Sequence, residues 1–107
     1  MLSLVLLIAA APAAAPNTAA IDRSRSAFVA CLKQAATAAK APEVTADSFA
    51  GYARSHCAAQ QTALVEAMVA FDVRNGASRK SAVEGADMAV DDYLETAKNN
   101  WAARLSN

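Results

Sequence analysis

The residues best suited to chemistry in this 107-residue sequence are its two cysteines and its single histidine. His56 directly precedes Cys57, Tyr52 stands one helical turn earlier, and Cys31 lies further back in the chain. Thiolates and an imidazole can bind a metal ion or act as nucleophile and base. Two Cys and one His fall short of a closed zinc site, and the sequence has no Cys-x-x-Cys motif. The pattern therefore favours a structural Cys31–Cys57 disulfide, with His56 packed against Tyr52 beside it.

An acidic stripe is the second candidate. At 100° per residue, Glu84, Asp87, Asp91 and Glu95 fall within a narrow arc of one predicted helix. Such a stripe can bind a cation or dock a basic partner. Carboxylates on a rigid helix rarely enclose Ca²⁺ without loop carbonyls, so the simpler expectation is a solvated face in which Asp91 and Glu95 pair with Lys98.

A small basic cluster is formed by Arg74, Arg79 and Lys80 around a predicted turn. It either contacts an anion or a lipid headgroup, or only keeps the protein soluble. We recognise no nucleophile motif, glycine-rich phosphate loop or carboxylate pair, and so predict no enzyme activity, no cofactor and no metal site. Ten basic and ten acidic residues give zero net charge, which argues against non-specific nucleic-acid binding.

The start of the chain predicts export. No ionisable side chain precedes Asp22, and an apolar run leads into Ala- and Pro-rich sequence, as in a secretory signal peptide over residues 1–20. The apolar run is about half the length that crosses a bilayer, so we expect no stable membrane anchor. Cleavage is expected after Ala20, with Ala13 as the alternative. The mature domain, 21–107, is then periplasmic in a bacterium and secreted otherwise.

The elements that position these residues are predicted to be helices. Apolar residues recur every three or four positions, Ala is abundant, and alternating β-branched stretches are absent. The predicted fold class is all-α, an up-down-up three-helix bundle with short connections. The first helix is expected over 22–40. The second should run from an N-cap at Thr45 to a C-cap at Asn75-Gly76. The third should start at Ser78 or at Ser81, where Ser81 would form a capping box with Glu84, and continue to the C-terminus.

This topology tests the pairing of the cysteines. Counted from a turn near Glu43, Cys31 lies twelve residues before it and Cys57 fourteen after it, so the two should be level on adjacent helices. A core this small is marginal, and closing a loop of about 27 residues is worth roughly 3–4 kcal/mol. We therefore predict an intramolecular disulfide.

The segment 64–73 is apolar nearly all round. Leu64, Met68 and Phe71 continue the core stripe, whereas three valines project to its other side. The first helix is expected to reach only about the level of Val65, so the last two turns of this segment should lack its cover. An uncovered apolar face indicates an interface, which a second copy, a foreign partner or an uncleaved N-terminal segment could occupy. The predicted partner surface comprises Val65, Val69, Val73, Arg74, Arg79 and Lys80.

Two functions are compatible with these features. The first is a non-catalytic protein-interaction module, such as an adaptor, inhibitor or small chaperone, with a protein partner or a second copy on the partner surface. The alternative is a carrier of a small ligand or metal, built around His56, Tyr52 or the acidic stripe.

Overall fold

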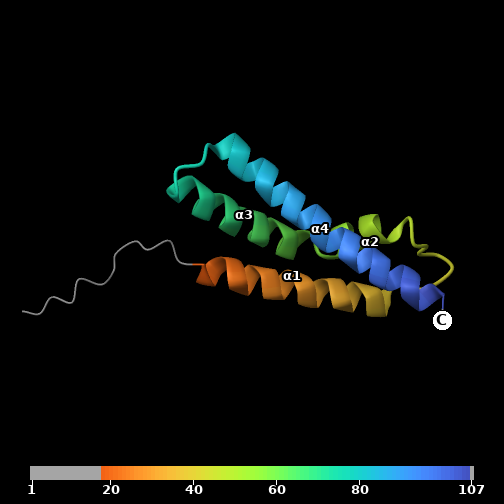
Figure 1. Ribbon diagram of the computed structural model, residues 1–107. Coiled ribbons are helices and arrows are strands. Elements are labelled where there is room, and N and C mark those ends of the chain that lie inside the picture. The colour runs from red at the N-terminus through yellow and green to blue at the C-terminus, as the bar shows by residue number, and fades with distance from the viewer. Residues whose placement is uncertain (1–17, 107) are drawn as a thin grey trace, which may run out of the picture.

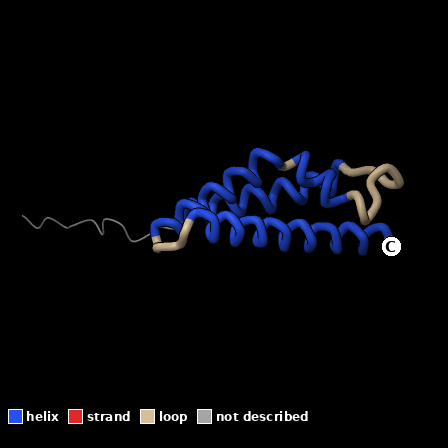
Figure 2. Tube along the Cα trace, turned by 90° about the horizontal axis from the view of Figure 1, so that it is seen from above, coloured by secondary structure: helices blue, strands red, loops and turns tan. Residues whose placement is uncertain are grey.

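The computed structural model describes residues 18–106, which form four helices and no strand. The first and last helices are long, and the two between them follow one another as a broken middle arm that runs in the opposite direction (Figure 1). Seen from above, the three arms lie side by side along the molecule (Figure 2). The all-α, up-down-up prediction is confirmed. The helices are α1 (Ala19–Ala38), α2 (Phe49–His56), α3 (Ala58–Arg74) and α4 (Arg79–Leu105).

The middle arm was predicted as one helix but is broken at Cys57, whose φ of −114° and ψ of 26° interrupt the helical geometry. The hydrogen bonds continue on both sides, from Cys57 N–H to the Ala53 carbonyl and from Gln61 N–H to the Cys57 carbonyl. The break therefore changes the direction of the arm without leaving these groups unpaired. It coincides with the point where the arm is covalently linked to α1.

Aromatic side chains join the arms in the core. Phe28 of α1 meets Tyr93 of α4 edge to face, with ring centroids 6.0 Å apart. Phe49 of α2 stacks on Trp101 of α4 at 5.3 Å. The indole N–H of Trp101 donates a hydrogen bond of 3.3 Å to the Val44 carbonyl, which fastens the α1–α2 connection to α4. These contacts fix the register of α4 against both other arms.

The turn between α3 and α4 follows the predicted signals. Gly76 has a φ of 97°, a left-handed conformation that glycine adopts without strain. The Ala77 N–H bonds to the Asp72 carbonyl and the Gly76 N–H to the Val73 carbonyl, the hydrogen-bond pattern of a Schellman motif. Of the two predicted starts for α4, Ser78 is correct, because its hydroxyl oxygen accepts from the Ser81 N–H.

The predicted start of the middle arm is wrong. Thr45 does not cap α2, which begins at Phe49 after Ser48. Instead Thr45 and Ser48 bond to each other in the preceding turn, where the Thr45 N–H donates to the Ser48 hydroxyl oxygen at 2.9 Å. The first helix is also shifted from its predicted 22–40, because it begins at Ala19 and ends at Ala38. The larger part of the predicted signal peptide, 1–17, lies outside the described residues.

Candidate functional site

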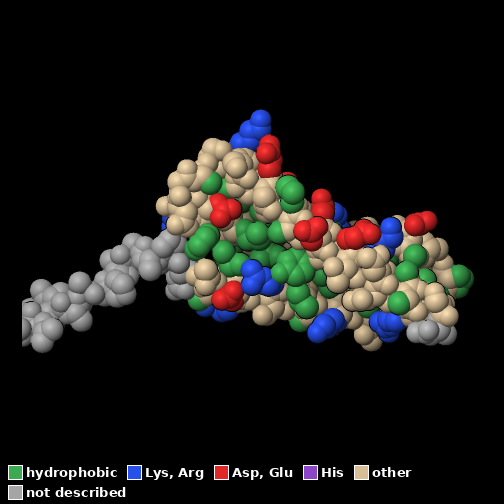
Figure 3. All heavy atoms as spheres, in the orientation of Figure 1, with side chains coloured by type: hydrophobic (Ala, Val, Ile, Leu, Met, Phe, Trp, Pro, Cys, Tyr) green, Lys and Arg blue, Asp and Glu red, His purple; other side chains and the backbone are tan. Residues whose placement is uncertain are grey.

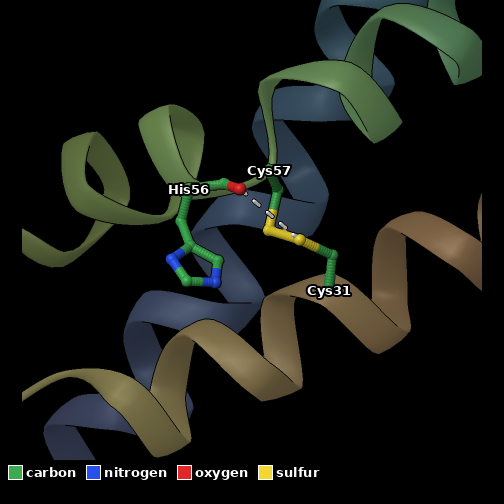
Figure 4. Close-up of a disulfide and its surroundings, with 3 residues drawn as sticks. All are labelled: Cys31, His56 and Cys57. Atoms are coloured by element: carbon green, nitrogen blue, oxygen red, sulfur yellow. Dashed lines mark hydrogen bonds between the residues drawn. A yellow bond between two sulfur atoms is a disulfide. The ribbon is translucent and has the colours of Figure 1, made fainter.

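The two cysteines form the predicted disulfide, which links α1 to the junction of α2 and α3 (Figure 4). Their Cα atoms are 5.8 Å apart, and both residues are buried in the main core cluster. The Cys31 sulfur lies 3.8 Å from the His56 carbonyl oxygen, a contact rather than a hydrogen bond because a disulfide sulfur has no proton. With both cysteines of the sequence in this bond, no thiol is available for catalysis or metal binding.

His56 is exposed and stacks on Tyr52, with ring centroids 5.8 Å apart and an interplanar angle of 27°. In Figure 4 the imidazole extends from α2 beside the disulfide, and only the carbonyl oxygen of His56 is directed at the sulfur atoms. The expected packing of His56 against Tyr52 is confirmed. Among the residues that the structure describes, no group of His, Cys, Asp and Glu side chains is arranged to hold a metal ion.

The acidic stripe lies on α4, and Glu84, Asp87, Asp91 and Glu95 are all exposed, as expected of a solvated face. The predicted partner of Asp91 is wrong, because its carboxylate pairs with Arg54 of α2 at 3.0 Å rather than with Lys98. Both side chains of that pair are largely in solvent, where an ion pair contributes about 0–1 kcal/mol.

Only part of the predicted partner surface is exposed in the structure. Val69 is only 6% exposed and packs with Ala82 and Ala86, so the expectation that it lies uncovered is wrong. The physical reason is the tight turn after α3, which folds the first turns of α4 back over that face. Val65 is half-buried, and Val73 is 42% exposed. The three basic members of the surface, Arg74, Arg79 and Lys80, are exposed as predicted.

A groove that the sequence did not indicate runs between α1 and α4. It has a volume of about 340 Å³, within the range of small-molecule sites. We call it the α1–α4 groove. It is lined by Val29, Leu32, Lys33, Ala36 and Thr37 of α1 and by Tyr93, Thr96, Ala97, Asn100 and Arg104 of α4.

The groove has an apolar end and a polar end. The two helices run in the same direction (Figure 1), and the contact between Phe28 and Tyr93 sets their register. Val29 is therefore level with Tyr93, and Thr37 is level with the turn between Asn100 and Arg104. Hydrophobic walls thus give way along the groove to an amide, a hydroxyl and a guanidinium.

Two cations face this groove, Lys33 from α1 and Arg104 from α4. The Arg104 guanidinium lies over the Trp101 ring, 5.5 Å from its centroid. Within residues 18–106 the ion pairs are Arg25–Asp22 and Arg54–Asp91, so neither Lys33 nor Arg104 is neutralised by a carboxylate there.

A shallower hollow of about 330 Å³ adjoins the apolar end and shares Tyr93 and Thr96 with the groove. Its other lining residues are Ala89 and Asp92. On the face shown in Figure 3, hydrophobic side chains gather where α1 runs beside α3 and α4, with acidic and basic side chains around them.

Sequence reasoning missed the groove because its walls are separated by more than fifty residues. Lys33, Thr96 and Asn100 each look like ordinary solvent-facing positions of an amphipathic helix. Only the parallel packing of α1 and α4 brings them together. Tyr93 and Trp101, polar-tipped aromatics on the stripe of α4, were the available signal.

Comparison of the chain with protein-family models, curated proteins and solved structures finds no match in any of the three. None of the four helices in residues 18–106 combines the length and hydrophobicity needed to span a bilayer.

Proposed function

We propose that this chain is an exported, non-catalytic carrier that holds a small amphiphilic ligand in the α1–α4 groove. The observation that carries the proposal is the polarity of that groove, whose walls pass from Val29 and Tyr93 to Asn100 and Arg104. A ligand with an alkyl tail and a polar head matches this change from apolar to polar walls along the groove. Pockets that bind small molecules combine such apolar walls with a few placed polar groups.

Two features support export. The apolar residues before Asp22 have the composition of a signal peptide. The Cys31–Cys57 disulfide is a bond that persists in oxidising compartments and is rare in the cytosol. Cleavage after Ala20 would shorten α1 by its first two residues, whereas cleavage after Ala13 would leave that helix whole.

The carrier is favoured over the protein-interaction module because the structure removes the main support for the module. That function depended on an uncovered valine face, and Val69 at its centre is covered by α4. The carrier also no longer depends on His56, Tyr52 or the acidic stripe, since the groove offers a separate site.

The test is binding of a series of linear alkanols of increasing length, followed by native mass spectrometry and by the fluorescence of Trp101, the only tryptophan of the chain. Each methylene that enters the groove tightens binding by up to about fourfold, and the gain stops when the groove is filled. Thr96→Phe fills the groove and should abolish binding. Asn99→Phe, at another exposed position of α4 outside the groove lining, is the matched control and should bind normally.

Binding that is independent of chain length, or that survives Thr96→Phe, would contradict the carrier. A protein in its native compartment that is found as a stable dimer or protein complex with an empty groove would instead support the interaction module.

A further inference from the structure

The charges around the α1–α4 groove indicate what kind of head its ligand has. Both charged side chains that line the groove, Lys33 and Arg104, are cationic. Asp92 does not line the groove but the adjoining hollow, which lies at the opposite, apolar end. We infer that the ligand is a single-chain carboxylate, such as a free fatty acid, with its head at Arg104 and its tail toward Tyr93. This inference rests on the proposed carrier function.

Arg104 is exposed, and a contact with Trp101 restrains its guanidinium before any ligand arrives. Its guanidinium lies over Trp101, which is itself fixed by stacking on Phe49 and by its hydrogen bond to the Val44 carbonyl. A planar guanidinium can donate two parallel hydrogen bonds to one carboxylate, and a fixed guanidinium loses little freedom in doing so. The chain thus offers a partly restrained guanidinium as the partner of a carboxylate head.

The neutral polar groups at this end are few. The Thr37 hydroxyl already donates its proton to the Lys33 carbonyl at 3.1 Å, so toward a ligand it can only accept. The Asn100 amide is the neutral side-chain donor of the lining at this level. One amide and two cations suit a compact anion better than a sugar or another head with many hydroxyls.

The dipoles of α1 and α4 oppose an anion at this end, so their partial charges have to be compared with the charges of Lys33 and Arg104. α1 and α4 both end near Arg104, and each C-terminus contributes roughly half a negative charge that acts only within the last turn. Lys33 lies more than one turn before the end of α1. Among the groups that line the groove, two full positive charges therefore exceed the partial charges of the two helix ends.

The experiment compares three ligands that share one tail: dodecanoate, dodecanol and dodecyltrimethylammonium, each below its critical micelle concentration. Isothermal titration calorimetry of the oxidised protein should show dodecanoate binding at least about tenfold more tightly than dodecanol, because a charge-assisted hydrogen bond to the head is added. The ammonium compound should bind most weakly. The preference for dodecanoate should fall as salt is raised.

Arg104→Gln should lower the affinity for dodecanoate about tenfold and leave that for dodecanol unchanged. Arg104→Lys keeps the charge but loses the planar fork, and should fall between the two. Arg79→Gln, on the same helix but at its other end, is the matched control and should behave as wild type. Thermal melts of all three variants verify that they are folded.

Equal binding of the three ligands would overturn the carboxylate inference while leaving the carrier intact. Binding of none of them by the folded protein would overturn the carrier itself. Co-sedimentation with phosphatidylglycerol vesicles that depends on Arg104, in the absence of dodecanoate binding, would show a membrane headgroup to be the anion and would overturn the free carboxylate.

Discussion

Reduction of the Cys31–Cys57 disulfide should remove a large share of the stability of the fold. The bond joins α1 to the α2–α3 junction across a sequence separation of 26 residues. Both cysteines lie in the core cluster that also contains Phe28, Leu32 and Leu64. Reduction leaves every side chain in place, so it isolates the effect of the cross-link.

The magnitude follows from the length of the closed loop. In the chain-entropy model a loop of this size restricts the unfolded chain by about 3.5 kcal/mol. Native domains are stable by only about 5–15 kcal/mol, and small ones lie near the lower limit. For a domain of this size 1 kcal/mol corresponds to about 4–8 °C, so the melting temperature should fall by about 14–28 °C.

The assay is thermal unfolding followed by circular dichroism at 222 nm, with and without a phosphine reductant, and with mass spectrometry to verify complete reduction. The double variant Cys31→Ala/Cys57→Ala is the control, because the reductant should not change its melting temperature. A fully reduced wild-type protein that melts within a few degrees of the oxidised one would refute the argument that the disulfide supports this core.

Three further predictions concern other parts of the chain. Val69→Asp should unfold the protein, because an unpaired carboxylate in the α3–α4 contact costs several kcal/mol. Val73→Asp, on the same helix but exposed, should change the free energy of unfolding by less than about 0.5 kcal/mol. Equal melting temperatures of the two variants would contradict the burial of Val69. Gln61→Met should raise the free energy of unfolding by about 1 kcal/mol, because the Gln61 Oε1 atom is buried without a hydrogen-bond partner. A lower melting temperature of the variant would show that this oxygen accepts a hydrogen bond in the wild-type protein. The intact mass of protein purified from its own compartment should lack residues 1–20, or 1–13 if the alternative site is used, and a retained N-terminus would exclude cleavage.

Local signals accounted for the parts of the fold that depend on a few neighbouring residues. The left-handed conformation at Gly76 follows from an Asn-Gly pair at the end of an apolar stripe, and the cap at Ser78 follows from its hydroxyl. The disulfide was predictable because a helical hairpin with a short turn places residues equidistant from that turn at the same level. In each case the residue types near the position leave few alternative local conformations, so the sequence was sufficient for the prediction.

The break at Cys57 had no local signal. The sequence around it contains neither Pro nor Gly within five residues, and its helical pattern continues. The direction of the middle arm is instead set by what its two halves pack against: Phe49 of α2 against Trp101, and Leu64 of α3 within the cluster that includes α1. Such constraints come from residues far away in the chain, as do those that bury Val69 and create the groove.

The most direct test of the proposed carrier is an amide chemical-shift titration of the ¹⁵N-labelled protein with dodecanoate. We expect saturable shifts concentrated along the two walls of the α1–α4 groove, at Val29, Lys33, Thr96 and Asn100, with the α3–α4 turn around Gly76 unaffected. A spectrum that changes neither with dodecanoate nor with dodecanol, or shifts centred on that turn instead, would contradict the carrier.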